Sequence, residues 1–229
     1  MMNNMTIAID GPAASGKSTA AERLASKLGF LYFDTGVMYR AVTLAGLNQF
    51  GSIDDEDQIS AMAKEIAIDV QPPTVEDGRK YDVLLNGKDV TWEIRSAKVT
   101  ANVSPVSAYP RVREELTAKQ RLVGERGNVV MVGRDIGTVV MPNADVKFYV
   151  DASAEVRAQR RYEEVVARGE QADYDEMLAA IKRRDEIDST RKVAPLVVAD
   201  DAIMIMNNDY TREEVVELMV KAIKEKKGN

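Results

Sequence analysis

The sequence predicts an α/β protein in which helices cover both faces of a mostly parallel sheet. Short apolar runs alternate along the chain with longer segments of helical periodicity, an order that is typical of parallel sheets. Residues 68–91 interrupt this alternation with turn signals that are typical of antiparallel strands. The length of 229 residues suits one large domain with a small insertion.

Each core element is predicted from its hydrophobic spacing. Short apolar runs predict strands at residues 6–10 (TIAID), 30–33 (FLYF), 128–132 (NVVMV), 146–150 (VKFYV) and 202–206 (AIMIM). Helical spacing predicts helices at residues 18–28, after Asp34-Thr35-Gly36, and at 54–67, 110–125, 153–168, 173–188 and from 211 onward. Asp173 with Glu176, and Thr211 with Glu214, have the spacing of capping boxes, which predicts where two of these helices begin.

The last helix is expected to be amphipathic. Its predicted apolar face consists of Val215, Leu218, Met219, Ala222 and Ile223. A charged run, KEKK at residues 224–227, closes it.

Residues 68–91 are predicted to form a small antiparallel insertion. Pro72-Pro73, Asp77-Gly78 and Asn86-Gly87 mark turns, and residues 81–85 form an extended run between two of them. Because Asn-Gly between extended runs favours a tight hairpin, we expect paired strands here.

The composition excludes several classes of site. The chain has no Cys and no His, so disulfides, thiolate nucleophiles, imidazole triads and zinc sites built on these residues are excluded. Any bound metal ion would be a hard cation held by oxygen atoms. Lys and Arg number 31 against 37 Asp and Glu, a net charge of −6, which argues against non-specific nucleic-acid binding. No membrane-spanning segment or signal peptide is visible, so we expect a cytoplasmic protein with no nucleic-acid or membrane partner.

A phosphate-binding loop is the most specific motif in the chain. Residues 11–18 (GPAASGKS) match G-x-x-x-x-G-K-[ST], and they follow a predicted strand and open a predicted helix. The residues expected to bind ATP are Gly11, Pro12, Ala13, Ala14, Ser15, Gly16, Lys17, Ser18 and Thr19. Lys17 would reach the β- and γ-phosphates, and the Ser18 hydroxyl would ligate Mg²⁺. The alternative, a glycine-rich turn that binds nothing, is disfavoured by this context.

The rest of the chain favours a kinase over other classes of nucleotide-binding protein. A GTPase would carry N-K-x-D, and the nearest string, Asn207-Asn208-Asp209, lacks both the Lys and the spacing. A motor ATPase would show an apolar strand that ends in Asp-Glu, whereas residues 129–132 run into Gly133-Arg134-Asp135. What the chain offers is clustered arginine, whose planar fork suits an acceptor that is itself a phosphate ester.

The arginines and their polar neighbours fall into four clusters. They are residues 34–40, then Ser104 with Arg111 and Arg113, then residues 133–135, and finally Arg157, Arg160 and Arg161 with Arg184, Asp188 and Arg191. The spacing of 157, 160 and 161 predicts three guanidinium groups on one helix face. Alone, this would more simply be an exposed basic face beside Glu163 and Glu164, and Arg184 with Asp188 a weak surface ion pair.

Several segments together resemble bacterial cytidylate kinases, members of the P-loop nucleoside monophosphate kinase superfamily. They are residues 11–19 (GPAASGKST), 34–40 (DTGVMYR), 109–113 (YPRVR), 133–140 (GRDIGTVV) and 191–196 (RKVAPL). The resemblance runs from about residue 6 to the last helix, and it is this combination, rather than the phosphate loop alone, that is specific.

The resemblance implies one kinase domain in three parts. They are a core (1–67, 92–156 and 189–229) with a five-stranded parallel sheet of order 2-3-1-4-5, a nucleoside-monophosphate-binding insertion (68–91) and a helical lid (157–188). The implied reaction is direct in-line transfer from Mg-ATP to CMP or dCMP, in pyrimidine nucleotide metabolism, by a monomer.

The resemblance also implies residue roles. Arg40 and Arg134 would hold the acceptor phosphate; Ser104, Arg113, Asp135 and Arg191 would read cytosine; and Arg184 and Asp188 would hold the ribose. Thr35 and Tyr39 complete the acceptor set, and Lys17, Arg157, Arg160 and Arg161 are the catalytic candidates. These roles agree with base chemistry, because the cytosine amine donates to a carboxylate or hydroxyl while N3 and O2 accept from guanidinium. Uracil reverses the pattern at N3 and at position 4, so it would bind less well.

One position departs from the family pattern. Val132 precedes Gly133 where many members carry an acid that would help to order Mg²⁺-bound water, but Ser18 and the ATP oxygens remain. Two alternatives stay open on the residues alone. One is a kinase of another small acceptor such as UMP or shikimate, and the other is a nucleotide-switched NTPase.

Overall fold

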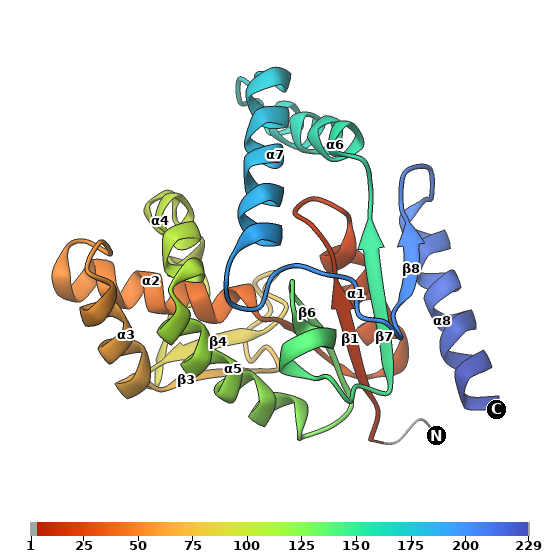
Figure 1. Ribbon diagram of the computed structural model, residues 1–229, viewed down its shortest axis with the longest axis horizontal. Helices are drawn as coiled ribbons and strands as arrows, with labels where there is room; N and C mark the ends of the chain where they lie inside the picture. The colour runs from red at the N-terminus through yellow and green to blue at the C-terminus, as the bar shows by residue number, and fades with distance from the viewer. Residues whose placement is uncertain (1–3, 229) are drawn as a thin grey trace.

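A five-stranded parallel sheet forms the centre of the protein in the computed structural model, which describes residues 4–228 (Figure 1). Its strands are β1 (Thr6–Asp10), β2 (Leu31–Asp34), β6 (Val129–Val132), β7 (Val146–Asp151) and β8 (Ile203–Met206). Their spatial order is β2-β6-β1-β7-β8. Counted along the core alone this is 2-3-1-4-5, so both the fold class and the expected strand order are confirmed.

Helices cover both faces of the sheet, and each face has its own hydrophobic core. The helices are α1 (Lys17–Leu28), α2 (Gly36–Phe50), α3 (Glu56–Glu65), α4 (Ala97–Ala108), α5 (Pro110–Gly124), α6 (Ala154–Ala167), α7 (Tyr174–Thr190) and α8 (Arg212–Gly228). Successive side chains of a strand point to opposite faces. Accordingly Ala8 packs in one core with α2 and α5, while Ile7 and Ile9 pack in the other with α1 and α8. Double coverage explains why the β1 segment is almost continuously apolar.

The parallel register brings the carboxyl ends of the strands to one edge of the sheet. Val132 at the end of β6 lies beside Ile9 of β1 on one side and Asp34 of β2 on the other. Ligands of doubly wound sheets bind at this edge. The loop after β1 and the turn after β6 therefore face the same space.

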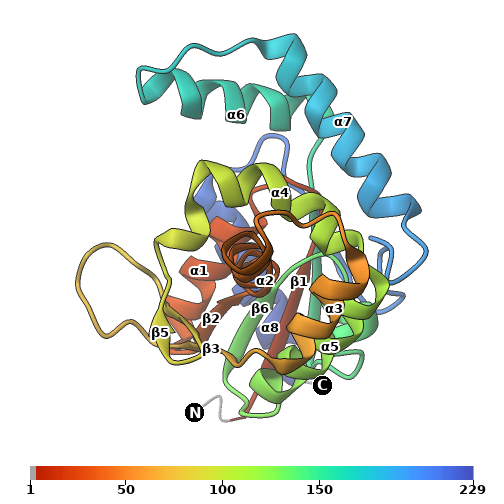
Figure 2. The ribbon, with the colours of Figure 1, turned by 90° about the vertical axis from the view of Figure 1, so that its left-hand side faces the viewer.

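The predicted antiparallel insertion is confirmed. It is a three-stranded sheet of β3 (Ile68–Gln71), β4 (Asp82–Leu85) and β5 (Lys88–Asp89). Asn86 and Gly87 both have positive φ, 50° and 80°, as a two-residue hairpin turn requires. Figure 2 shows this small sheet below the level of the helical pair α6–α7.

The helical pair of α6 and α7 stands above the carboxyl edge of the main sheet (Figures 1 and 2). Arg157 of α6 donates to both carboxylate oxygens of Asp185 on α7, at 2.9 and 2.5 Å, which joins the two helices. Within residues 4–228, no helix is both long and apolar enough to cross a membrane.

Two details of the predicted elements were wrong or incomplete. Helix α4 was not predicted, because Pro105 lies inside it and signals a break; Ser96 caps its start by accepting from Val99 N. In α8, Leu218 is exposed, whereas Val216 is buried beside Val215. Val215, Met219 and Ile223 are buried as predicted, so the predicted face is largely confirmed and only its edge shifts, from Leu218 to Val216.

Candidate functional site

The phosphate loop joins β1 to α1 through a backbone that needs glycine. Gly11 has φ 148° and Gly16 φ 89°, and a Cβ on Gly11 would lie 2.0 Å from the carbonyl oxygen of Val150. A Cβ on Gly16 would lie 2.5 Å from Nδ2 of Asn207. Helix α1 begins at Lys17, so its first N–H groups and its positive dipole end point toward the loop. This arrangement binds anions, phosphates above all.

Lys17 is a buried cation inside this loop. Its Nζ donates to the carbonyl oxygen of Pro12 at 2.8 Å. Burial, reinforced by the charge of Arg134, holds the pKa of Lys17 well below its ordinary value, and the carboxylates of Asp34, Asp188 and Asp10 oppose the shift. Lys17 forms no salt bridge within the described residues, so its buried positive charge favours the binding of an anion such as a triphosphate.

The three predicted catalytic arginines of α6 do not share one face. Arg157 is buried and donates to the carbonyl oxygen of Ala13 in the phosphate loop at 3.2 Å. Arg160 donates to the carbonyl oxygen of Asn207 at 2.7 Å, and its Nη1 is buried without a hydrogen-bond partner among residues 4–228. The side chain of Arg161 is 51% exposed and pairs with Glu164. Because each residue turns an α-helix by about 100°, residues 160 and 161 point in different directions.

Asp188 lies at the centre of a group of arginine side chains. This carboxylate is 1% exposed and lies within salt-bridge distance of Arg134 (2.8 Å), Arg184 (3.2 Å) and Arg191 (3.7 Å). Burial would raise the pKa of Asp188, but the neighbouring arginines outweigh it and hold the pKa below its ordinary value. The pair of Arg184 and Asp188 is therefore part of a buried network, not a surface ion pair.

Asp135 forms a second carboxylate centre next to Asp188. It accepts from Arg113 at 2.6 Å and from Arg191 at 3.3 Å. The guanidinium of Arg113 lies 5.4 Å from the ring centre of Tyr39, close enough for a cation–π contact. Arg191 belongs to both networks, so the two carboxylates are linked through one side chain.

The remaining predicted acceptor residues border the same space. Ser104 on α4 accepts a hydrogen bond from Arg184, so helix α4 meets α7 here. Arg40 donates to the carbonyl oxygen of Ile94 at 3.2 Å. Its pKa is lowered by burial and further by the charges of Arg95 and Arg184, while Asp34 opposes the shift. Thr35 donates to the carbonyl oxygen of Val132 at 3.1 Å.

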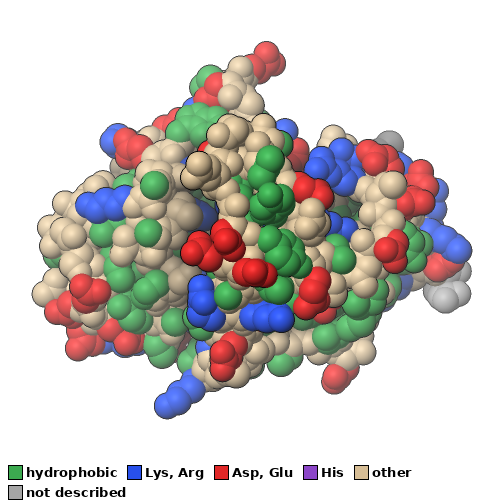
Figure 3. Space-filling view, turned by 90° about the horizontal axis from the view of Figure 1, so that it is seen from above, with side chains coloured by type: hydrophobic (Ala, Val, Ile, Leu, Met, Phe, Trp, Pro, Cys, Tyr) green, Lys and Arg blue, Asp and Glu red, His purple; other side chains and the backbone are tan. Residues whose placement is uncertain are grey.

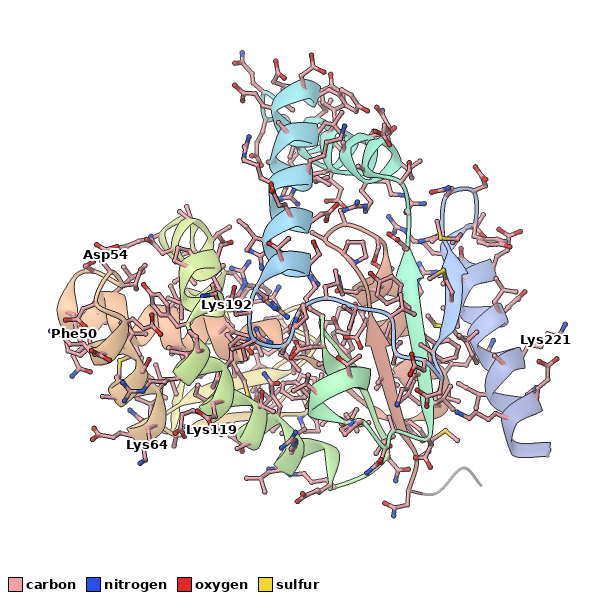
Figure 4. All side chains as sticks on the ribbon, in the orientation of Figure 1. Phe50, Asp54, Lys64, Lys119, Lys192 and Lys221 are labelled. Atoms are coloured by element: carbon pink, nitrogen blue, oxygen red, sulfur yellow. The ribbon has the colours of Figure 1, made fainter. Side chains whose placement is uncertain are left out.

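Charged side chains are exposed next to this site. Lys192 follows Arg191 just beyond the lower end of α7 and is exposed (Figure 4). Seen from above, Lys and Arg side chains lie among Asp and Glu side chains (Figure 3). This face of the molecule is thus mixed in charge rather than uniformly basic.

Sequence reasoning missed several residues of the site. Asp10 at the end of β1 is buried and accepts from Ile136 N and Gly137 N at 2.8 and 2.7 Å. Asn207 donates from Nδ2 to the carbonyl oxygen of Ser15 at 2.8 Å, which braces the phosphate loop from the end of β8. Polar residues at the carboxyl ends of predicted strands are the signal that would have found Asp10.

The residues present fit a hard cation bound together with a triphosphate. No cluster of three or more Asp and Glu side chains suited to a metal ion occurs in the described part of the chain, so phosphate oxygens would have to supply most ligands. Ser18 contributes a hydroxyl at the start of α1. Asp34 lies in register beside Val132 and accepts from Gly36 N at 2.9 Å. An all-oxygen environment of this kind suits Mg²⁺.

Comparisons with known proteins agree over nearly the whole chain. The sequence profile of the family described as cytidylate kinase matches residues 7–225. A cytidylate kinase of Chloroflexus aggregans is 50% identical over 215 residues, which are 94% of this chain and 92% of that protein. One from Bacillus subtilis is 44% identical over 226 residues, 99% of each chain. A solved structure of an uncharacterized protein from Eubacterium ventriosum covers 97% of this chain and 99% of its own, with a TM-score of 0.52 and 14% identity; that likeness shows the fold alone.

Proposed function

The chain belongs to the cytidylate kinase family, and we propose that the site described above transfers the γ-phosphoryl group of Mg-ATP to CMP or dCMP. The products are ADP and CDP or dCDP. The observation that carries the residue assignment is the meeting of two features at one sheet edge. The buried Lys17 of the phosphate loop lies within the electrostatic field of Arg134 and Asp188. A triphosphate and a nucleoside monophosphate would thus be bound next to each other.

The acceptor base is read by the Asp135 centre. Its carboxylate accepts from the exocyclic amine of cytosine, while Arg113 and Arg191, already bonded to Asp135, present further N–H groups to N3 and O2. The pre-formed pairs fix the guanidinium planes before the substrate arrives, which reduces the entropy lost on binding. At position 4 uracil has an acceptor where cytosine has a donor. Its oxygen would therefore face a carboxylate oxygen of Asp135, and no hydrogen bond could form between the two acceptors.

The acceptor phosphate and sugar lie toward Asp188. Arg134 and Arg40 are assigned to the phosphate, and Arg184 and Asp188 to the ribose, with Ser104, Thr35 and Tyr39 completing the wall of the site. Arg134 is held by Asp188 at 2.8 Å and Arg40 by the backbone of Ile94 at 3.2 Å. Both arginines therefore approach the substrate from fixed positions.

The transfer step requires positioning and neutralisation of charge rather than a general base. The acceptor oxygen belongs to a phosphate that is already ionised at neutral pH. The backbone N–H groups of residues 13–19 and the ammonium group of Lys17 hold the donor phosphates in line with it. Mg²⁺, when bound through Ser18 and the phosphates, would neutralise part of their charge.

Contacts between the lid and the phosphate loop would couple ATP binding to closure of the lid over the site. Arg157 contacts both the phosphate loop and Asp185 of α7, and Arg160 contacts the end of β8. Movement of the lid (residues 157–188) against the core (1–67, 92–156 and 189–229) and the insertion (68–91) would exclude water from the donor phosphate and suppress hydrolysis. We expect the chain to act in this way as a cytoplasmic monomer on small nucleotides, without nucleic acid or membrane.

An acceptor-specific variant tests these assignments. Asp135→Asn keeps the size of the side chain but removes its charge and one acceptor oxygen. We expect kcat/KM for CMP to fall by about 10- to 100-fold, the loss of about 1.5–3 kcal/mol in a hydrogen bond to a charged group, while the KM for ATP changes little. An equal loss for both substrates would mean that Asp135 only supports the fold.

A further inference from the structure

Asp10 is a buried carboxylate to which the proposed mechanism gives no task. It ends the central strand β1, is 4% exposed, and precedes the first glycine of the phosphate loop. Its two oxygens accept from the backbone N–H groups of Ile136 and Gly137, at 2.8 and 2.7 Å.

Those N–H groups begin the short turn of helix η2 (Ile136–Val140), which follows Asp135. The first N–H groups of any helix have no partner within it and need one from outside. An aspartate at the position before a helix ordinarily supplies that partner from its own side chain. Asp135 occupies this position, yet its side chain caps nothing in the part of the chain that is described.

The Asp135 carboxylate bonds instead to Arg113 at 2.6 Å and to Arg191 at 3.3 Å. It can do so because Asp10, from the neighbouring strand, already satisfies the start of η2. The two carboxylates are also close enough for the charge of Asp135 to raise the pKa of Asp10, which burial brings to about 6. Repulsion between them would further turn Asp135 toward its arginines.

We propose that Asp10 is a positioning residue for base specificity: it caps η2 in place of Asp135 and so leaves the Asp135 carboxylate available to the acceptor base. This inference rests on the proposed function, in which Asp135 reads the cytosine amine. Without Asp10, the N–H group of Gly137 would have no acceptor and would lie within reach of Asp135. The Asp135 carboxylate could then accept a hydrogen bond either from this N–H group or from the substrate, and the two would compete.

The test is a double-mutant cycle with Asp10→Asn, Asp135→Asn and the two combined. In each protein, kcat/KM is measured for CMP and for UMP at saturating Mg-ATP, together with the KM for ATP. We expect Asp10→Asn to lower the preference for CMP over UMP by about tenfold or more, and to change the KM for ATP by less than about threefold. In the Asp135→Asn background the same change should have little further effect on the preference, since Asp10 acts through Asp135.

Asp151→Asn is the matched control. Asp151 also ends a strand at this edge, β7, but accepts from Ala152 N at 2.7 Å rather than from η2, so we expect the preference for CMP to be retained. If Asp10→Asn does not fold, Asp10→Ser removes the carboxylate in a smaller side chain, whose oxygen lies one bond closer to the backbone, and is expected to show a loss of the same kind.

Two results would overturn the inference. In the first, Asp10→Asn lowers kcat/KM for CMP and for UMP by the same factor. In the second, the effects of Asp10→Asn and Asp135→Asn on the ratio of kcat/KM for CMP to that for UMP multiply in the double variant. Either result would give Asp10 a general structural role. Failure of the proposed function would look different, because the unmodified protein would then show no preference for CMP.

Discussion

Removal of the Asp188 charge should destabilise the protein more than removal of any comparable surface carboxylate. Asp188 is 1% exposed and lies within salt-bridge distance of Arg134, Arg184 and Arg191, whose side chains are 20%, 27% and 8% exposed. Breaking a fully buried ion pair by removing one partner costs about 3–5 kcal/mol. Two of these arginines reach solvent, and Asn keeps one acceptor oxygen, so we expect the free energy of unfolding to fall by about 2–3 kcal/mol in Asp188→Asn.

The assay is urea denaturation at pH 7, read as a change of midpoint at constant slope. Asp57→Asn is the control, because Asp57 pairs with Arg111 at 2.7 Å but its side chain is 88% exposed; we expect a change below about 1 kcal/mol. A loss in Asp188→Asn no larger than in this control would refute the view that Asp188 holds the acceptor half of the site together.

The pH dependence of the same difference provides an independent check. The pKa of Asp188 is lowered in the folded protein, where the arginines outweigh burial. A carboxyl group with a lowered folded pKa stabilises the protein above its unfolded pKa, about 3.9, and loses that contribution as the pH falls through the folded value. The difference in free energy of unfolding between the unmodified protein and Asp188→Asn should therefore be constant from about pH 5 to 8. It should become smaller below about pH 4.

Three further predictions follow from the phosphate loop and the lid. Lys17→Met should lower turnover by orders of magnitude but leave the free energy of unfolding unchanged or raised, because burial already disfavours the Lys17 charge; a large loss of stability by calorimetry would contradict this. Gly11→Ala should destabilise the protein by at least about 1–3 kcal/mol and abolish ATP binding measured by titration calorimetry, since its Cβ would lie 2.0 Å from a carbonyl oxygen. Arg157→Ala should raise both the KM for ATP and the rate of ATP hydrolysis without acceptor, whereas Arg161→Ala, whose side chain is 51% exposed, should change neither; equal effects would show that the lid arginines act together.

Much of the fold could be predicted because local signals and tertiary structure agree. The β1 run TIAID is apolar on both sides because two cores enclose it, and Asn86-Gly87 forms the hairpin turn that its residues favour. Helix α4 could not be predicted from local signals, because Pro105 signals a break while the contacts of the helix with α2 and α5 hold it in place. The inward face of α8 likewise depends on where the helix meets the sheet, which buries Val216 in place of Leu218.

The site, like the fold, has one part that local sequence predicted and another that depends on contacts between distant segments. The phosphate loop is a local motif, and its sequence alone identified it. The acceptor network is long-range: Arg134 and Asp188 are 54 positions apart, and no spacing rule connects them. Their roles came from the family resemblance. Asp10 belongs to no motif; its place at the end of the predicted first strand marks it as a candidate, and only the structure shows its bonds to the turn after β6. Spacing placed Arg157, Arg160 and Arg161 on one helix face, but the structure shows different surroundings for each. Arg157 is buried against the phosphate loop, Arg160 bonds to the backbone after β8, and Arg161 is exposed.

The most direct test of the whole account is ADP release from Mg-ATP with CMP, dCMP, UMP, AMP and GMP offered separately. We expect rapid release with CMP and dCMP, much slower release with UMP, and little with either purine nucleotide or without an acceptor. Release without any acceptor, or equal release with all of them, would contradict the assignment of the Asp135 and Asp188 networks to a cytidine monophosphate and leave only the phosphate loop with an assigned ligand.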